Sequence, residues 1–143
     1  MMFKSIGLLV TLMLICWGTA LALEPVEQLG KDIFFDEALS TPAGQACAAC
    51  HAPNTAFVGP DPEVNAHGSV YPGAIHTRAG NRKPPSAAYA SFSPDFYFDE
   101  VEGIYVGGMF WDGRALNTVE QAKGPFLNPV EMANTKAQVI AAV

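Results

Sequence analysis

The segment QACAACH, residues 45–51, holds the residues of this chain with the clearest capacity for chemistry. Cys47 and Cys50 stand three positions apart, and His51 follows the second thiol directly. Two thiols and an imidazole at this spacing could bind zinc, exchange a disulfide, or attach a haem whose iron the histidine binds. The rest of the sequence has to discriminate among these three chemistries.

Zinc binding and disulfide exchange find little support elsewhere in the chain. Structural zinc sites take four ligands, and beyond the motif the sequence offers only His67 and His76, with irregular spacing and no second cysteine pair. A thioredoxin-like dithiol is expected within a βαβ pattern, and none surrounds Cys47. Because C-x-x-C-H is the signature of c-type haem attachment, the motif favours thioether bonds at both cysteines and iron ligation by His51.

The residue on the other side of the iron decides between electron transfer and chemistry. A carrier needs a permanent sixth ligand, whereas a catalyst needs an open or labile position. As alternatives to a ligand role, each methionine of the chain suits core packing and each loop histidine suits a surface or hydrogen-bonded position. The residues alone leave four candidates open, namely Met109, Met132, His67 and His76.

The first 22 residues have the pattern of a secretory signal peptide. Lys4 precedes an apolar run over residues 6–17, and the sequence ALA at residues 20–22 has the small-x-small form of a cleavage site. The apolar run is shorter than the roughly 20 residues that a membrane-spanning helix needs. We therefore predict cleavage after residue 22, loss of Cys16 with the signal, and a periplasmic protein without membrane attachment.

Charge and length limit the classes of partner and the number of domains. The chain has a formal net charge of -6, and removal of the signal with Lys4 leaves seven basic against fourteen acidic residues, or -7. Such a balance argues against binding of nucleic acid or anionic lipid and suits a basic protein partner. Residues 23–143 are enough for one domain and too few for two.

The hydrophobic pattern predicts short helices separated by long loops. The expected elements are a helix over residues 24–39, a short helix from residue 45, a long ordered loop over 52–85, a helical turn over 86–92, extended chain over 96–111 that reverses near residues 102–103, a helix from Thr118 to Gly124-Pro125, and a last helix over 136–143. That last helix stops without a closing signal, which predicts a fragment or a shortened form of a longer protein.

Five sequence blocks around and after the cysteine motif resemble one family, the bacterial di-haem cytochrome c peroxidases with the related tryptophan-modifying di-haem enzymes. The blocks are, in order, LGKDIFFDEALS, GNRKPPSAAYASFSP, GGMFWDGRA, the pair QA, and GPFLNPVEM. One block would be a weak sign, whereas five in the same order are specific. The resemblance implies an all-α, cytochrome c-like haem domain with long irregular loops, equivalent to the N-terminal peroxidatic domain, with the family's second haem domain absent.

The resemblance also implies a role for each matching residue. Glu131 would be the distal acid-base carboxylate that moves a proton between the two oxygens of hydrogen peroxide, and Gln121 the distal amide that orients the substrate. Trp111 would lie on the electron path between haems, and Arg114 would pair with a haem propionate. His76 is the nearest match to the labile distal histidine of the resting iron.

The implied function is reduction of hydrogen peroxide to water with electrons from a small cytochrome c or a cupredoxin, using one covalent haem c in this chain. A mono-haem electron-transfer protein and a tryptophan-oxidising maturation enzyme of the same superfamily are the alternatives. Calcium, which the family binds between its domains, stays open, because Lys83 stands where the family has an asparagine ligand. Apolar surface left uncovered by an absent domain predicts a homodimer or poor solubility.

Overall fold

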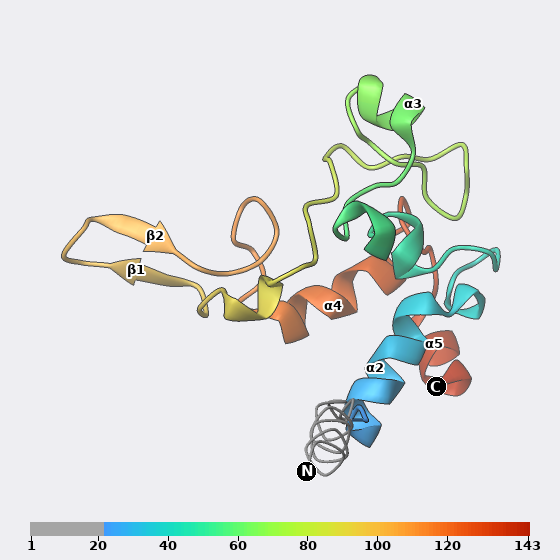
Figure 1. Cartoon of the computed structure of the whole chain (residues 1–143), viewed down its shortest axis with the longest axis horizontal. Coiled ribbons are helices and arrows are strands. Elements are labelled where there is room, and N and C mark those ends of the chain that lie inside the picture. Colours follow the sequence, from blue (N-terminus) through green and yellow to red (C-terminus); the bar gives the residue numbers. More distant parts are fainter. Residues whose placement is uncertain (1–21) are drawn as a thin grey trace, which may run out of the picture.

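The computed structural model describes residues 22–143, so the predicted signal peptide up to residue 21, with Cys16, lies outside the described residues. Within residues 22–143, no helix is long and apolar enough to span a membrane. The elements in chain order are α2 (Pro25–Phe35), the 3-10 helices η1 (Glu37–Leu39), η2 (Cys47–Ala49) and η3 (Pro53–Thr55), α3 (Pro62–Ala66), the 3-10 helix η4 (Ala90–Phe92), β1 (Tyr97–Asp99), β2 (Ile104–Val106), α4 (Thr118–Leu127) and α5 (Lys136–Ala142) (Figure 1).

The expectation of an all-α domain is wrong. The described residues form four α-helices and a two-stranded antiparallel sheet, in which Tyr97 lies opposite Val106 and Phe98 opposite Tyr105. Aromatic and β-branched residues favour strands, and Gly103 closes the turn at a φ of +67°, which other residues rarely adopt. The chain reversal expected at this point is present, but its two arms pair as a hairpin, so the fold is mixed.

The predicted helix over residues 24–39 is two elements. Glu24 and Glu27 form a capping box at the start of α2, where the Glu24 N–H donates to the Glu27 carboxylate at 2.9 Å. The helix ends early because Asp36 adopts an extended conformation and its carboxylate accepts from the Ala38 N–H at 2.8 Å. A short acidic side chain that bonds to nearby backbone in this way competes with helix continuation.

The two C-terminal helices follow the sequence pattern closely, with one difference. Asn117, rather than Thr118, caps the first turn of α4. Pro125 was expected to end α4, but the helix continues to residue 127, because a proline in the last turns removes a single helix hydrogen bond. α5 begins at residue 136, as predicted, and the side chain of Thr135 caps it.

The predicted loop over residues 52–85 contains a self-contained excursion around α3, which lies at the periphery of the molecule (Figure 1). The Tyr71 hydroxyl closes this excursion, accepting from the Asp61 N–H at 2.8 Å and donating to Asn65 Oδ1 at 3.2 Å. The Tyr71 ring lies so close to Gly59 that a Cβ at that glycine would collide with it. The ends of the excursion are therefore held together by its own side chains.

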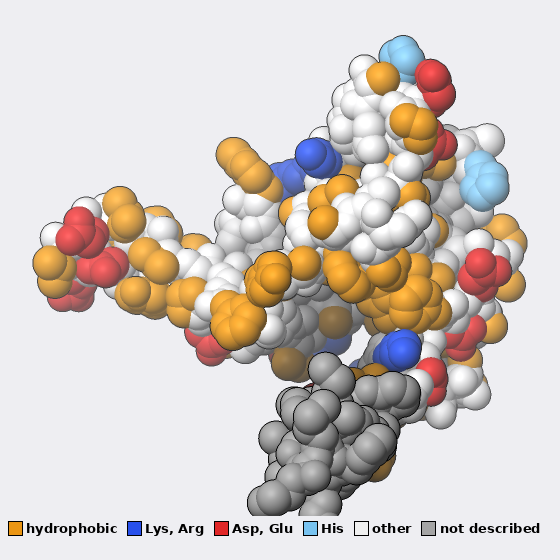
Figure 2. All heavy atoms as spheres, viewed as in Figure 1, with side chains coloured by type: hydrophobic (Ala, Val, Ile, Leu, Met, Phe, Trp, Pro, Cys, Tyr) orange, Lys and Arg blue, Asp and Glu red, His pale blue; other side chains and the backbone are white. Residues whose placement is uncertain are grey.

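The buried core is small and most of it surrounds the cysteine motif. Its hydrophobic members are Leu39, Ala46, Ala52, Ala74, Ala115 and Met132. By contrast, the hairpin extends away from α4 at one end of the molecule (Figure 1). Figure 2 shows acidic side chains gathered at its tip, where Asp99, Glu100 and Glu102 lie among exposed apolar residues.

Candidate functional site

Cys47 and Cys50 lie on one short turn. The N–H groups of Cys50 and His51 both donate to the Cys47 carbonyl, at 3.2 and 3.0 Å, so a 3-10 turn takes the place of the predicted helix. Both thiols are free and half-buried. The turn thus presents two unpaired thiols beside an imidazole, which is the donor set that a c-type haem requires.

The His51 ring is oriented by the backbone. Its Nδ1 lies 3.1 Å from the Phe57 carbonyl oxygen, and because that oxygen can only accept, the ring proton resides on Nδ1. The Phe57 carbonyl is placed by a backbone bridge between Ala52 and Val58, in which the Ala52 N–H donates to the Val58 carbonyl at 3.1 Å. Nε2 keeps its lone pair, as in metal-binding histidines held by a carbonyl. The residues therefore fit a haem iron.

The surroundings of the two thiols disfavour thiolate chemistry. Burial raises the pKa of Cys47 and of Cys50, and the negative charge of Glu131 raises both further. Redox-active and metal-binding cysteines instead have a lowered pKa, because the thiolate is the reactive form. Glu131 lies some eighty positions further along the chain. Its negative charge nevertheless acts on both sulfurs.

The segment that contains this turn, residues 39–52, contacts two segments distant in sequence, residues 71–76 and residues 128–134. We call residues 71–76 the strap, and the three segments together the attachment frame. The Thr41 N–H donates to the Met132 carbonyl at 2.8 Å, and Asn134 Nδ2 donates to the Leu39 carbonyl at 3.0 Å. Met132 and Leu39 are both buried. The frame thus joins residues 39–41 to residues 132–134, more than ninety positions further along the chain.

Glu131 is held at both its side chain and its backbone. Asn128 Nδ2 donates to Glu131 Oε1 at 2.7 Å, while Asn128 Oδ1 accepts from the Val130 N–H at 3.2 Å, which fixes the orientation of the amide. The Glu131 carbonyl accepts from the Ala74 N–H of the strap at 2.7 Å. This close approach requires a glycine at position 73, because the Cβ of any other residue there would collide with the Val130 carbonyl oxygen, at a distance of 2.5 Å.

Gln45 connects the cysteine turn to the strap. Its Nε2 lies 3.3 Å from the Pro72 carbonyl oxygen and 3.8 Å from Cys50 Sγ. Its Oε1 is buried without a hydrogen-bond partner among the described residues. An unsatisfied buried acceptor costs about 1–3 kcal/mol.

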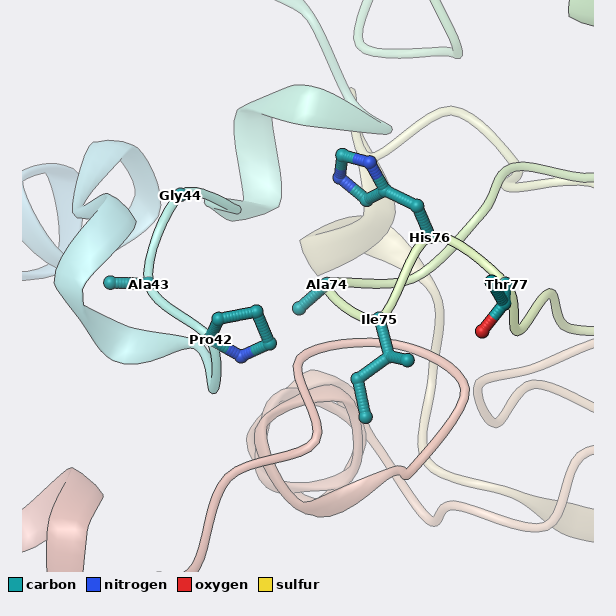
Figure 3. A pocket seen from close by; sticks show the side chains of 7 residues that line it. All are labelled: Pro42, Ala43, Gly44, Ala74, Ile75, His76 and Thr77. Atoms are coloured by element: carbon teal, nitrogen blue, oxygen red, sulfur yellow. The ribbon is translucent and has the colours of Figure 1, made fainter.

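His76 lies at the end of the strap, exposed at the junction of two cavities. The larger cavity, about 470 Å³, lies between residues 42–44 and residues 74–77 (Figure 3). The smaller, about 300 Å³, is lined by His76 together with Gln45 and Cys50. The other loop histidine, His67, is exposed on the α3 excursion with Nδ1 bonded to the Glu63 carbonyl. Of the two, only His76 shares a cavity with the cysteine motif.

The FWDGR loop, residues 110–114, forms a second and more exposed cluster. The carboxylate of Asp112 bonds Arg82 Nη1 at 2.9 Å and Arg114 Nη1 at 2.7 Å, and these contacts lower its pKa to about 2. Trp111 is 90% exposed, with the Arg82 guanidinium 5.9 Å from its ring centroid. The Arg114 guanidinium stacks over Phe110 at 3.6 Å. Arg114 is therefore paired with a carboxylate of its own loop.

The structure groups the predicted site residues unevenly. It brings Glu131 and the strap with His76 to the cysteine turn, and it places Trp111 and Arg114 together in the FWDGR loop. Gln121 is half-buried on α4, between these two groups in the chain. α4 and the FWDGR loop meet at Gly124 and Phe110. A side chain at position 124 would place its Cβ 3.2 Å from the Phe110 ring, so the glycine leaves room for this contact.

Sequence reasoning missed the residues that support this site. Gln45 and Asn128 hold the strap and Glu131, and Arg82 and Asp112 hold the FWDGR loop. Two signals were available, because Asn128 lies three positions before Glu131 and Gln45 is a polar residue directly before the cysteine turn. Within residues 22–143, no group of three or more histidine, cysteine or acidic residues forms a candidate metal site.

Comparisons with known proteins agree on one family. Residues 24–143 match the family described as di-haem cytochrome c peroxidase. The chain is 43% identical over 129 residues to methylamine utilization protein MauG of Paracoccus denitrificans, covering 87% of this chain and 33% of that protein. It is 34% identical over 112 residues to cytochrome c551 peroxidase of Pseudomonas aeruginosa, covering 78% of this chain and 26% of that protein.

A solved structure shows the same similarity in three dimensions. The diheme peroxidase BthA from Burkholderia thailandensis superposes with a TM-score of 0.71 at 38% sequence identity, over 81% of this chain and 28% of that one. The chain thus spans a third or less of the length of these relatives.

Proposed function

Because the chain belongs to the di-haem cytochrome c peroxidase family, we propose that it forms the peroxide-reducing haem site of a periplasmic enzyme of that family. Cys47 and Cys50 attach one haem c, and His51 binds its iron through Nε2. Glu131 is the acid-base group for hydrogen peroxide. The observation that carries this proposal is geometric: the backbone of residues 131–132 is hydrogen-bonded to Ala74 of the strap at 2.7 Å and to Thr41 at 2.8 Å, within the frame that holds the cysteine turn.

The work of the protein residues is proton transfer and orientation. When bound, the haem supplies the iron at which peroxide is reduced. Glu131 accepts a proton from one peroxide oxygen and returns it to the other, so that cleavage of the O–O bond releases water; two electrons and two protons complete the conversion of H₂O₂ to two waters. Asn128 keeps the carboxylate in one orientation, and Gln121 orients the substrate through its amide.

Electrons come from outside the site, and Trp111 lies on their path. An indole that is 90% exposed is accessible to a neighbouring redox group. The acidic balance of the chain without its signal, seven basic against fourteen acidic residues or -7, steers a basic electron-donor protein, such as a small cytochrome c or a cupredoxin. His76 is the labile iron ligand of the resting state. Dimerisation of this chain, tested by size-exclusion chromatography, remains a prediction from the many exposed apolar side chains.

A second candidate function is oxidation of a protein substrate. The identity to MauG, at 43%, exceeds the identity to cytochrome c551 peroxidase, at 34%. Identity alone does not separate the two branches, however, because a second MauG relative is only 29% identical, below the 34% of the cytochrome c551 peroxidase. The two functions differ in the molecule that supplies the electrons after peroxide has reacted. A peroxidase takes them from a small electron-donor protein, whereas a maturation enzyme takes them from the specific protein that it oxidises.

The decisive experiment is the reaction of the haem-loaded chain with one equivalent of peroxide, followed by absorption spectroscopy. Glu131→Gln should slow this reaction about 10²–10⁴-fold, the usual contribution of general acid-base catalysis. Glu102→Gln, the same change at an exposed residue of the hairpin turn, should leave the rate unaltered. Equal rates for wild type and Glu131→Gln would exclude the assigned role, and a wild type indifferent to peroxide would indicate an electron carrier.

A further inference from the structure

The amide of the half-buried Gln45 has one orientation that its protein contacts favour. Nε2 faces two acceptors, the Pro72 carbonyl and Cys50 Sγ, and a sulfur remains a weak acceptor once it is a thioether. Turning the amide over would lose both contacts. The opposite atom, Oε1, is buried without a partner among the described residues.

The strap that Gln45 contacts is fastened to Glu131 at its next two residues. Gly73 packs directly under residues 130–131, where a Cβ would lie 2.5 and 2.7 Å from their two carbonyl oxygens. Ala74 then donates its N–H to the Glu131 carbonyl at 2.7 Å. The strap and residues 130–131 are therefore in direct backbone contact, which couples the position of one to that of the other.

We propose that Gln45 is a positioning residue, which anchors the strap to the cysteine turn and thereby sets the distance between the Glu131 carboxylate and the haem motif. This inference rests on the proposed function of Glu131. The contacts run from the Gln45 amide through the Pro72 carbonyl, Gly73 and the Ala74 N–H to the Glu131 backbone. They leave the Glu131 side chain free to react, with only Asn128 on one oxygen.

The anchor explains why a polar side chain occupies this position. An apolar residue of the same size would avoid the orphaned Oε1, but it would donate nothing to the strap. Gln45 is not itself placed to act on peroxide, because its only donor group is engaged by Pro72 and Cys50.

Two substitutions separate hydrogen bonding from space filling. Gln45→Met keeps the length and removes both polar atoms, whereas Gln45→Glu keeps the shape but replaces the donor by a second, negatively charged acceptor. The matched control is Gln138→Met, at an exposed glutamine on α5. All are prepared as the full chain loaded with haem, and backbone hydrogen exchange is followed by mass spectrometry in residues 71–76 and 128–134. The rate and pH profile of the reaction with peroxide are measured in parallel.

We expect both Gln45 variants to exchange at least about tenfold faster than wild type in these two segments, with unchanged exchange in the hairpin and in Gln138→Met. The peroxide reaction should slow and its pH profile should shift. Wild-type exchange in Gln45→Met would overturn the proposal in favour of space filling, and faster exchange with an unaltered peroxide reaction would overturn the link to Glu131. Failure of both Gln45 variants to bind haem, with Gln138→Met normal, would also overturn it, since an anchor of the strap is not needed for attachment.

The same experiment keeps the two proposals distinguishable. A wild-type chain that binds haem without reacting with peroxide contradicts the proposed function. Hydrogen exchange in that chain still reports whether Gln45 holds the strap, because this measurement does not depend on turnover.

Discussion

The attachment frame and the hairpin with its FWDGR loop are stabilised in opposite ways. In the frame, buried backbone and amide groups join segments more than ninety positions apart, as between Thr41 Oγ1 and Asn134 Oδ1 at 3.2 Å. In the hairpin, the contacts are local and exposed, and Phe96 stacks on Tyr105 with ring centroids 5.3 Å apart. The proposed proton chemistry thus lies where the chain is fixed, and the proposed electron path lies where it is accessible.

The largest effect is expected in the frame. Leu39 is fully buried, so Leu39→Ala should lower the free energy of unfolding by about 2–5 kcal/mol through lost burial and a cavity. Ile104→Ala, at a hairpin residue that is 54% exposed, should change it by less than about 0.5 kcal/mol. Urea denaturation of the haem-loaded chain measures both. Equal losses at the two positions would remove the contrast between the regions.

Asn134→Ala should have the next largest effect, about 1–3 kcal/mol, because it leaves the Leu39 carbonyl and the Thr135 N–H without their partner. The same denaturation experiment applies, with Asn54→Ala, at an exposed asparagine, as the control. A loss no greater than that of the control would mean that buried amides do not join the two ends of the frame.

Tyr105→Ala should act locally and cost about 0.5–1.5 kcal/mol, the usual value of an aromatic pair. Tyr105 contacts both Phe96 and Phe98, with centroids 5.3 and 5.0 Å away. Hydrogen exchange should accelerate in residues 97–106 and stay unchanged in the attachment frame. Val101→Ala, at a turn residue that is 92% exposed, is the control. Acceleration in the frame as well would show that the two regions unfold together.

The smallest effect is expected from acid. The pKa of Asp112 is lowered to about 2 by Arg82 and Arg114. The stabilisation that the ionised carboxylate gives to the FWDGR loop is therefore fully present above the ordinary pKa of 3.8 and is lost as the pH falls toward 2. Fluorescence of Trp111 should report this change in wild type, because loss of the Asp112 contact frees the Arg82 guanidinium near the indole. Asp112→Asn should show no such transition between pH 4 and pH 2, and a transition retained in this variant would assign it to another group.

The sequence was informative where structure depends on neighbours in the chain. The start of the last helix at residue 136 and the reversal near residues 102–103 were predicted correctly, because helix starts and turns use residues a few positions apart. The family was also correct, since five blocks in order carry it. The all-α class was wrong because pairing of Tyr97 with Val106 depends on register between two segments, for which aromatic content gives only a weak signal.

The candidate site shows the same limit. The roles of Cys47, Cys50 and His51 are local and could be proposed from seven consecutive residues. The contacts of Gln45 with Pro72 and of Ala74 with Glu131 join positions 27 and 57 residues apart. No pattern within one segment predicts such pairs, because each is decided by how the chain packs as a whole.

The α3 excursion offers a point of attachment for engineering. Since Tyr71 closes residues 59–71 with its own hydroxyl and ring, the loop between these ends can be lengthened at a small entropic cost, which grows only logarithmically with length. A surface tag, an affinity sequence or an electrode linker inserted there would immobilise the protein in a defined orientation. Because Pro60, Asp61 and Val64 line the cavity beside Cys50, the linker belongs after α3, at residues 67–69, which do not line that cavity.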